Sequence, residues 1–121
     1  MVENSCTDFK KSMPFEKRLS ESTKVLEKYP ERVPIICQRS IHCKDIPIIR
    51  KMKYLVPIHF SIGQFIHIIR KRSDIKPEQA IFVFVNNNIP PNSDSILTVY
   101  DKYKDKDGFL YITYSGENTF G

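Results

Sequence analysis

The sequence lacks the features by which several classes of protein are recognised. It has no tryptophan and only four glycines and three cysteines among its 121 residues. Its longest near-continuous apolar stretch, Ala80 to Val85, is far shorter than the roughly 18 to 20 residues of a membrane-spanning helix. Glu3, Asp8 and Lys10 stand where a secretory signal has an apolar segment. We therefore expect a chain that is not exported, with free thiols in a reducing cytosol.

Patterns that carry catalysis are missing as well. The histidines and cysteines have no CxxC pair and no zinc-ligand spacing; they are Cys6, Cys37, His42, Cys43, His59 and His67. Cys37 alternates within an apolar strand, which predicts a core residue. The glycines form no phosphate-binding loop, and Asp105 and Asp107 are interpreted as turn formers. We expect no enzyme, no metal site and no cofactor.

What is present is an ordinary globular composition with a basic surplus. Hydrophobic residues make up 40% and charged residues 27% of a 14.2 kDa chain, which predicts one domain. The net charge of +5 suits an acidic partner: nucleic acid, an anionic membrane or an acidic peptide. A nucleic-acid binder would need aromatic residues among its basic clusters, and only Tyr54 lies in one. We therefore expect no nucleic-acid partner.

Hydrophobic periodicity predicts an α+β fold. The expected elements are a helix from Pro14 to Tyr29, strands at 33–39 and 53–56, a helix at 61–72, a strand at 80–85, a short helix at 96–103 and a strand at 109–114. The spacing of Ser61 and Gln64 is that of a capping box, and residues 80–85 have the pattern of a strand covered on both faces. A hairpin, a crossing helix and two later strands describe a β-grasp with additional helix at the N-terminus.

Several segments match one known family. They are residues 14–18 (PFEKR), 29–36 (YPERVPII), 53–57 (KYLVP), 63–65 (GQF), 69–72 (IRKR), 84–86 (FVN), 90–91 (PP), 107–111 (DGFLY) and 114–121. From Pro14 to Gly121 the chain resembles the ubiquitin-like autophagy modifiers, the family of the GABA-receptor-associated protein and the microtubule-associated light chains. Its C-terminus is most similar to the fungal members, while residues 1–13 show no match. The resemblance implies a ubiquitin-like β-grasp with extra N-terminal helices over residues 14–114, preceded by a tail or short helix at 1–13.

The resemblance also implies conjugation of Gly121 to phosphatidylethanolamine. The partners would be activating and conjugating cysteine enzymes and a processing and deconjugating cysteine protease. Glycine has no Cβ to obstruct attack at its carbonyl, and residues 115–121 are predicted to be a flexible tail that reaches narrow active sites. Two acyl chains would then anchor a cytoplasmic protein on autophagosomal membranes.

A second implied activity is the docking of receptors and adaptors that carry a short aromatic-x-x-aliphatic motif. Residues three apart on an extended peptide point to opposite faces, so the strand at 53–57 needs a pocket on each side. By family position the aromatic pocket comprises Glu21, Val25, Pro34, Ile36, Lys53, Leu55 and Phe109. The aliphatic pocket comprises Tyr54, Val56, Pro57, Phe60, Phe65 and Ile68. Arg32, Lys51 and Arg72, together with Lys53, would contact acidic residues flanking the motif.

Other interpretations stay open at this point. Most of the apolar residues in both pockets would also be expected in a simple core, and the basic residues could be solvated charge. Conjugation could be to protein lysines rather than to lipid. The chain could also be a non-covalent trafficking or tubulin-binding adaptor in which Gly121 has no role. Phe60 stands where relatives have leucine, which predicts a modestly altered preference for the aliphatic ligand residue.

Overall fold

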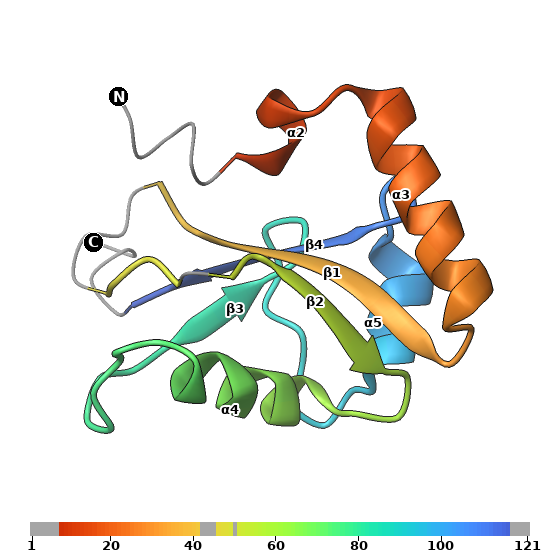
Figure 1. Cartoon of the computed structure of the whole chain (residues 1–121). Helices are drawn as coiled ribbons and strands as arrows, with labels where there is room; N and C mark the ends of the chain where they lie inside the picture. The colour runs from red at the N-terminus through yellow and green to blue at the C-terminus, as the bar shows by residue number, and fades with distance from the viewer. Residues whose placement is uncertain (1–7, 42–45, 50, 117–121) are drawn as a thin grey trace.

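A computed structural model describes residues 8–41, 46–49 and 51–116 and shows a four-stranded sheet with helices on both faces (Figure 1). Its elements are α2 (Phe9–Ser12), α3 (Phe15–Lys28), β1 (Arg32–Arg39), β2 (Lys53–Pro57), α4 (Ile62–Lys71), β3 (Phe82–Phe84), α5 (Ile96–Tyr103) and β4 (Leu110–Ser115). From α3 onward this is the predicted order of elements, and the α+β fold is confirmed.

The strands are arranged in the order β2-β1-β4-β3. β1 pairs with β2 in antiparallel fashion, with Val33 opposite Val56, and with β4 in parallel fashion, with Ile35 opposite Leu110. β3 runs antiparallel to β4. The order leaves β2 at one edge of the sheet, where its outer side can pair with another extended chain.

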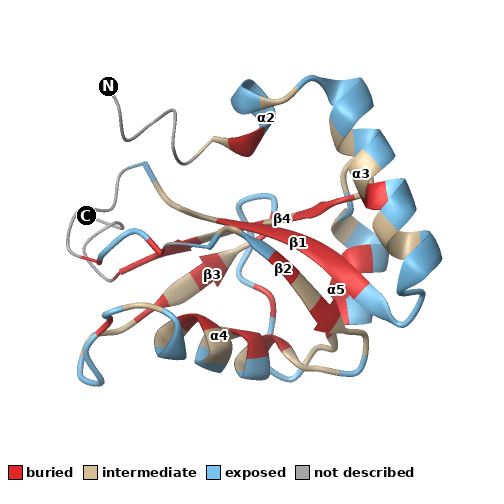
Figure 2. Ribbon diagram, in the orientation of Figure 1, coloured by how far each residue is buried: buried red, intermediate tan, exposed pale blue. Residues whose placement is uncertain are grey.

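The two faces of the sheet are covered by different helices (Figures 1 and 2). Alternate residues of β1, among them Ile35 and Cys37, belong to the main core together with buried residues of α4 and α5. Ile36 lies on the opposite face, in a smaller cluster with Phe9 and Phe109. The prediction of Cys37 as a core residue is confirmed, and burial raises the pKa of its thiol far above the ordinary value.

The capping box predicted for α4 is present. The Ser61 hydroxyl accepts a hydrogen bond from the Gln64 N–H (3.1 Å), and the Gln64 side chain accepts one from the Ser61 N–H (2.8 Å). These two bonds pair polar groups at the start of the helix. Ile62, Phe65 and Ile69 are then fully buried along one face of α4.

Two predictions need correction. The strand expected at 80–85 is limited to β3, and Phe82 and Phe84 are half-buried, so the expectation that both faces are covered is wrong. The reason is that β3 is an edge strand whose Val83 side alone faces the main core. The second correction is that β4 extends through the fully buried Ser115, past the expected start of the tail. Of the two alternatives expected within residues 1–13, residues 9–12 form the short helix, α2. Gly121 lies outside the described residues.

Candidate functional site

The free edge strand β2 presents side chains alternately to the two faces of the sheet. Tyr54 and Val56 are buried in the main core, on the α4 side. Lys53 points to the opposite face, where its ammonium Nζ lies 2.8 Å from Glu21 Oε2 on α3. The predicted alternation therefore exists, with one set of side chains reaching α3 and the other α4.

The residues predicted for the aromatic pocket come from α3, β1, β2 and the turn before β4. Glu21 and Val25 are half-buried and four residues apart on α3, which places them on one helix face. Pro34 of β1 pairs with Leu55 of β2. Ile36 (0% exposed) and Phe109 (3% exposed) pack together in the small cluster. Lys53, whose ammonium donates to Glu21, is the last of the residues predicted for the aromatic pocket.

The residues predicted for the aliphatic pocket lie between β2 and α4. The rings of Tyr54 and Phe65 meet edge to face, with centroids 5.6 Å apart. Phe60 and Ile68 are partly buried and pack against the same core as Val56. Pro57 ends β2, and its carbonyl accepts a hydrogen bond from the Phe60 N–H (3.1 Å). Tyr54, Val56 and Phe65 are core residues, while Pro57, Phe60 and Ile68 keep part of their surface exposed.

The three predicted flanking cations lie around β2. Arg32 is opposite Pro57 and its guanidinium lies 3.5 Å from the Leu55 carbonyl. The Lys51 ammonium is 5.5 Å from the centroid of the Tyr54 ring. Arg72 caps the C-terminus of α4, and its charge partly offsets the burial that raises the pKa of Tyr54 to about 12. All three are exposed, and none forms an ion pair with another of the described residues.

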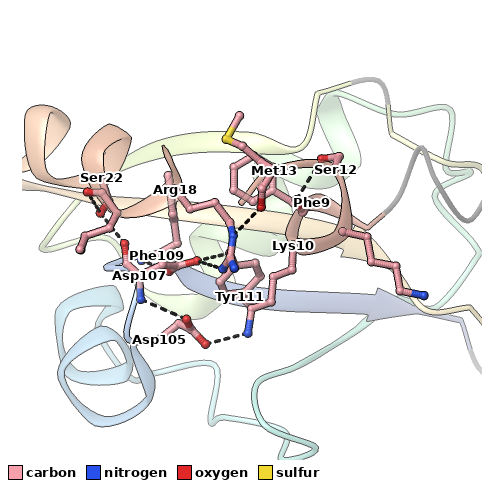
Figure 3. Close-up of polar contacts among 12 residues, drawn as sticks. Phe9, Lys10, Ser12, Met13, Arg18, Ser22, Asp105, Asp107, Phe109 and Tyr111 are labelled. Carbon is pink, nitrogen blue, oxygen red and sulfur yellow. Dashed lines mark hydrogen bonds and ion pairs between the residues drawn. The ribbon is translucent and has the colours of Figure 1, made fainter. Parts of the chain in front are cut away.

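A buried ionic cluster fixes α3 to the turn that leads into β4 (Figure 3). The Asp107 carboxylate is fully buried and accepts hydrogen bonds from Arg18 Nη1 (2.6 Å), the Tyr111 hydroxyl (2.5 Å) and the Phe109 N–H (2.9 Å). The Ser22 hydroxyl donates to the Asp107 carbonyl (2.5 Å). Burial and the bond to the Asp107 carboxylate raise the pKa of Tyr111. Because Phe109 follows this turn directly, the cluster also positions Phe109, one of the residues predicted for the aromatic pocket.

The prediction of Asp107 as a turn former is correct but incomplete. Its bond to the Phe109 N–H, two residues on, is a local turn contact that the sequence could predict. Its ion pair with Arg18 joins residues 89 positions apart, and no local pattern indicates that pairing. Gly108 has a φ of +90°, and a Cβ there would collide with the Ser22 side chain.

Sequence reasoning missed the contribution of an N-terminal arm, defined here as residues 8–13. The Phe9 ring is 3% exposed and packs edge to face on Phe109, with centroids 5.4 Å apart. The Phe9 N–H donates to Gln38 Oε1 (2.6 Å). The available signal was Asp8 immediately before Phe9: its carboxylate caps α2 by accepting from the Lys11 N–H (3.3 Å).

An ion pair also holds the arm. Lys10 Nζ lies 2.7 Å from Asp105 Oδ1 and 4.6 Å from the centroid of the Tyr111 ring. Burial alone would raise the pKa of the Asp105 carboxyl. The hydrogen bonds from Lys10 and the Asp107 N–H, with the charges of Lys10 and Arg18, outweigh burial and hold this pKa below its usual value.

The described part of the chain has neither a grouped set of metal ligands nor a membrane-spanning helix. Within residues 8–41, 46–49 and 51–116, no three histidine, cysteine, aspartate or glutamate side chains are grouped as metal ligands would be. Cys6, His42 and Cys43 fall outside these ranges. No helix in the described part of the chain is both long and apolar enough to span a membrane.

Comparison with known proteins identifies the family to which the chain belongs. Residues 17–121 match the family described as "Autophagy protein Atg8 ubiquitin like". The chain belongs to the Atg8 family. It is 53% identical over 115 residues to the autophagy-related protein 8 of Vanderwaltozyma polyspora, covering 95% of this chain and 97% of the relative. The Schizosaccharomyces pombe protein of the same name is 50% identical over 115 residues, covering 95% of this chain and 94% of the relative.

Structural comparison agrees with the sequence matches. The crystal structure of Trypanosoma brucei ATG8 has a TM-score of 0.88 and 44% identity, and the match covers 95% of this chain and 98% of the other. The ubiquitin-like fold with N-terminal helices is thereby confirmed. The 115 residues aligned with the fungal Atg8 proteins exceed the stretch from Pro14 to Gly121, so the similarity extends into the first 13 residues, where none was expected.

Proposed function

We propose that this Atg8-family protein is a ubiquitin-like modifier, not an enzyme, with two linked activities. Gly121 is conjugated to phosphatidylethanolamine, and the β2 edge docks receptors and adaptors carrying an aromatic-x-x-aliphatic motif. The protein would be cytoplasmic when free and on the autophagosome membrane when lipidated. The observation that carries the docking proposal is the free edge of β2, whose alternate side chains reach α3 on one face and α4 on the other.

A docked peptide would extend the sheet as a further strand beside β2. Main-chain hydrogen bonds to the free edge would supply affinity independent of sequence, and the two pockets would select the motif residues. The exposed cations Arg32, Lys51 and Arg72 have no anionic partner among the described residues, so they are available to acidic residues of a ligand. A site this small predicts micromolar affinity, about 8 kcal/mol, with gain from many copies on one membrane.

The conjugation proposal rests on family membership and on the match that extends to Gly121. The Gly121 carboxylate would attack ATP to form an adenylate, with release of pyrophosphate. A cysteine thiolate of the activating enzyme would displace AMP, and exchange would carry the thioester to the conjugating cysteine. The amine of phosphatidylethanolamine would then form the amide and release the thiol.

Docking can be tested with a synthetic Trp-x-x-Leu peptide. The chain has no tryptophan, so the fluorescence of the peptide's indole reports binding without background. Ile68→Ala should weaken binding about tenfold, because it removes part of the aliphatic pocket. Ile66→Ala is the matched control, since Ile66 lies on the same helix and is also partly buried against the core. Equal loss in the two variants would refute the assigned pocket.

Conjugation can be tested by reconstitution with the activating and conjugating enzymes, ATP and phosphatidylethanolamine vesicles. We expect retention of the wild type on the vesicles and no thioester or retention for a variant that lacks Gly121. Attachment to a protein lysine would instead give a species larger by the mass of a target protein. A non-covalent adaptor would reach membranes without Gly121, and that result would refute the conjugation proposal.

A further inference from the structure

Phe9 of the N-terminal arm lies on the residues assigned to the aromatic pocket. Its ring packs on Phe109 and belongs to the same buried cluster as Ile36. The Lys53 ammonium lies 5.3 Å from the centroid of the Phe9 ring while it bonds Glu21 (2.8 Å). An aromatic ring of the chain itself therefore packs on Phe109, lies beside Lys53 and shares a buried cluster with Ile36, three members of the predicted pocket.

This packing covers the floor of the pocket. Ile36 is 0% and Phe109 3% exposed, so no outside ring can reach either while Phe9 and Lys53 keep these positions. We propose that Phe9 is an intramolecular competitor for the aromatic pocket, and that the arm must undock before the aromatic residue of a peptide enters. This inference rests on the docking function proposed above.

The contacts that hold the arm are few and mostly near its surface (Figure 3). Besides the Phe9 ring, residues 8–12 are held by the bond from the Phe9 N–H to Gln38 Oε1 (2.6 Å) and by Lys10, which pairs with Asp105 (2.7 Å) and lies 4.6 Å from the centroid of the Tyr111 ring. Met13 is held separately, because its carbonyl accepts a hydrogen bond from Arg18 (3.0 Å). α2 has only 4 residues, so the helix has little stability apart from these contacts. Residues 8–12 can therefore leave together, while Met13 stays bonded to Arg18.

Undocking would leave the rest of the fold in place. None of the residues of the arm belongs to the main core cluster. Arg18 donates to the Met13 carbonyl (3.0 Å) and pairs with Asp107, which holds the start of α3 at the turn when Phe9 leaves. Met13 and Pro14 have extended backbone, which separates α2 from α3 and provides a place for the chain to pivot.

A competitor of this kind lowers apparent affinity by the fraction of molecules in which the pocket is open. A minor state holds at most about 10% of molecules, so Phe9→Ala should tighten binding of the Trp-x-x-Leu peptide at least about tenfold. Lys10→Ala removes the ion pair with Asp105 and the contact with the Tyr111 ring but leaves Phe9 in place, and it should tighten binding by up to about fivefold. Phe15→Ala is the matched control, because Phe15 is an aromatic residue on α3 that is 42% exposed and outside the cluster; it should leave affinity unchanged.

The outcomes separate this inference from the docking proposal. Tighter binding by Phe9→Ala and not by Phe15→Ala supports the competitor. Equal binding by wild type and Phe9→Ala overturns it and leaves docking intact. Weaker binding overturns it in favour of Phe9 as a wall of the pocket. Absence of binding by the wild type and every variant refutes docking and the inference together.

A second variant, Phe9→Trp, keeps the proposal testable if Phe9→Ala fails to fold. Phe9→Trp introduces the only indole of the chain into the cluster and is titrated with a Phe-x-x-Leu peptide, which has no indole. We expect blue-shifted emission in the free protein and a red shift at saturation, as the indole moves into water. Emission that stays blue-shifted while the peptide is bound would overturn the proposal.

Discussion

The two faces of the sheet differ in the size of the apolar cluster that covers them, as Ile35 and Ile36 illustrate. Both are fully buried neighbours on β1. Ile35 lies in a large continuous core closed by α4 and α5, whereas Ile36 lies in a small cluster closed by Phe9 of the short helix α2. The two side chains are equally buried, but they differ in how easily they can be exposed. Ile35 is enclosed by the main core, whereas Ile36 is enclosed by an arm that can detach.

The difference between the two clusters indicates where a ligand can enter without unfolding the protein. Opening the large core would expose most of the apolar surface on which stability depends. Opening the small cluster requires only that α2 leaves. The aromatic pocket assigned by family position lies on this second side, where the cost of opening is lowest.

The largest expected effect separates the two isoleucines. Ile35→Ala should lower the free energy of unfolding by about 4 kcal/mol, because its surroundings cannot collapse into the cavity. Ile36→Ala should cost about 2 kcal/mol, because the arm can shift or undock over the vacancy. Urea denaturation of both variants measures the difference. Equal losses would mean that the two faces are packed alike.

Removal of the Asp107 carboxylate should come next in size. Asp107→Ala leaves three donors without their acceptor, from Arg18, Phe109 and Tyr111, and should cost about 3 kcal/mol. Asp107→Asn keeps the shape and one oxygen and should cost less. Thermal unfolding of the two variants compares them, and a loss below about 1 kcal/mol for Asp107→Ala would show that the buried pair is not needed.

A smaller loss is expected at Gly108. Gly108→Ala forces a side chain onto a residue with φ of +90° and into the Ser22 hydroxyl, at a cost of about 2 kcal/mol. Ser22→Gly removes the collision but also the hydrogen bond from Ser22 to the Asp107 carbonyl, so the double variant should lose less stability than the sum of the losses of the two single variants. Strict additivity of the two changes would contradict direct contact between these positions.

The smallest effect is a pH dependence of arm docking. The lowered pKa of Asp105 means that its ion pair with Lys10 stabilises the docked arm above the unfolded pKa of about 4. That contribution is lost as pH falls through the lower folded value, and it amounts to about 0.5 kcal/mol for a partly exposed pair. Emission of Phe9→Trp between pH 7 and pH 3 should report the change. In the double variant Phe9→Trp, Lys10→Ala this pH-dependent change in emission should disappear. If the change persists, a group other than the Lys10–Asp105 pair causes it.

Local pattern predicted much of the fold and the alternation of side chains along β2, while the pocket residues were assigned by family position. The capping box at Ser61, the apolar spacing of α4 and the alternation along β2 are short-range properties, and each was found as expected. β3 was overestimated because a run of apolar residues does not show whether a strand lies at an edge. Phe9 and the Arg18–Asp107 pair were missed because their partners are distant in the chain.

Amide hydrogen exchange tests the contrast between the two faces most directly. We predict that amides of α2, including that of Phe9, exchange at least about a hundredfold faster than those of α4, because local undocking costs far less than global unfolding. Saturating Trp-x-x-Leu peptide should speed exchange in α2 further and leave α4 unchanged. Protection of α2 equal to that of α4, with or without peptide, would contradict a detachable arm and the account built on it.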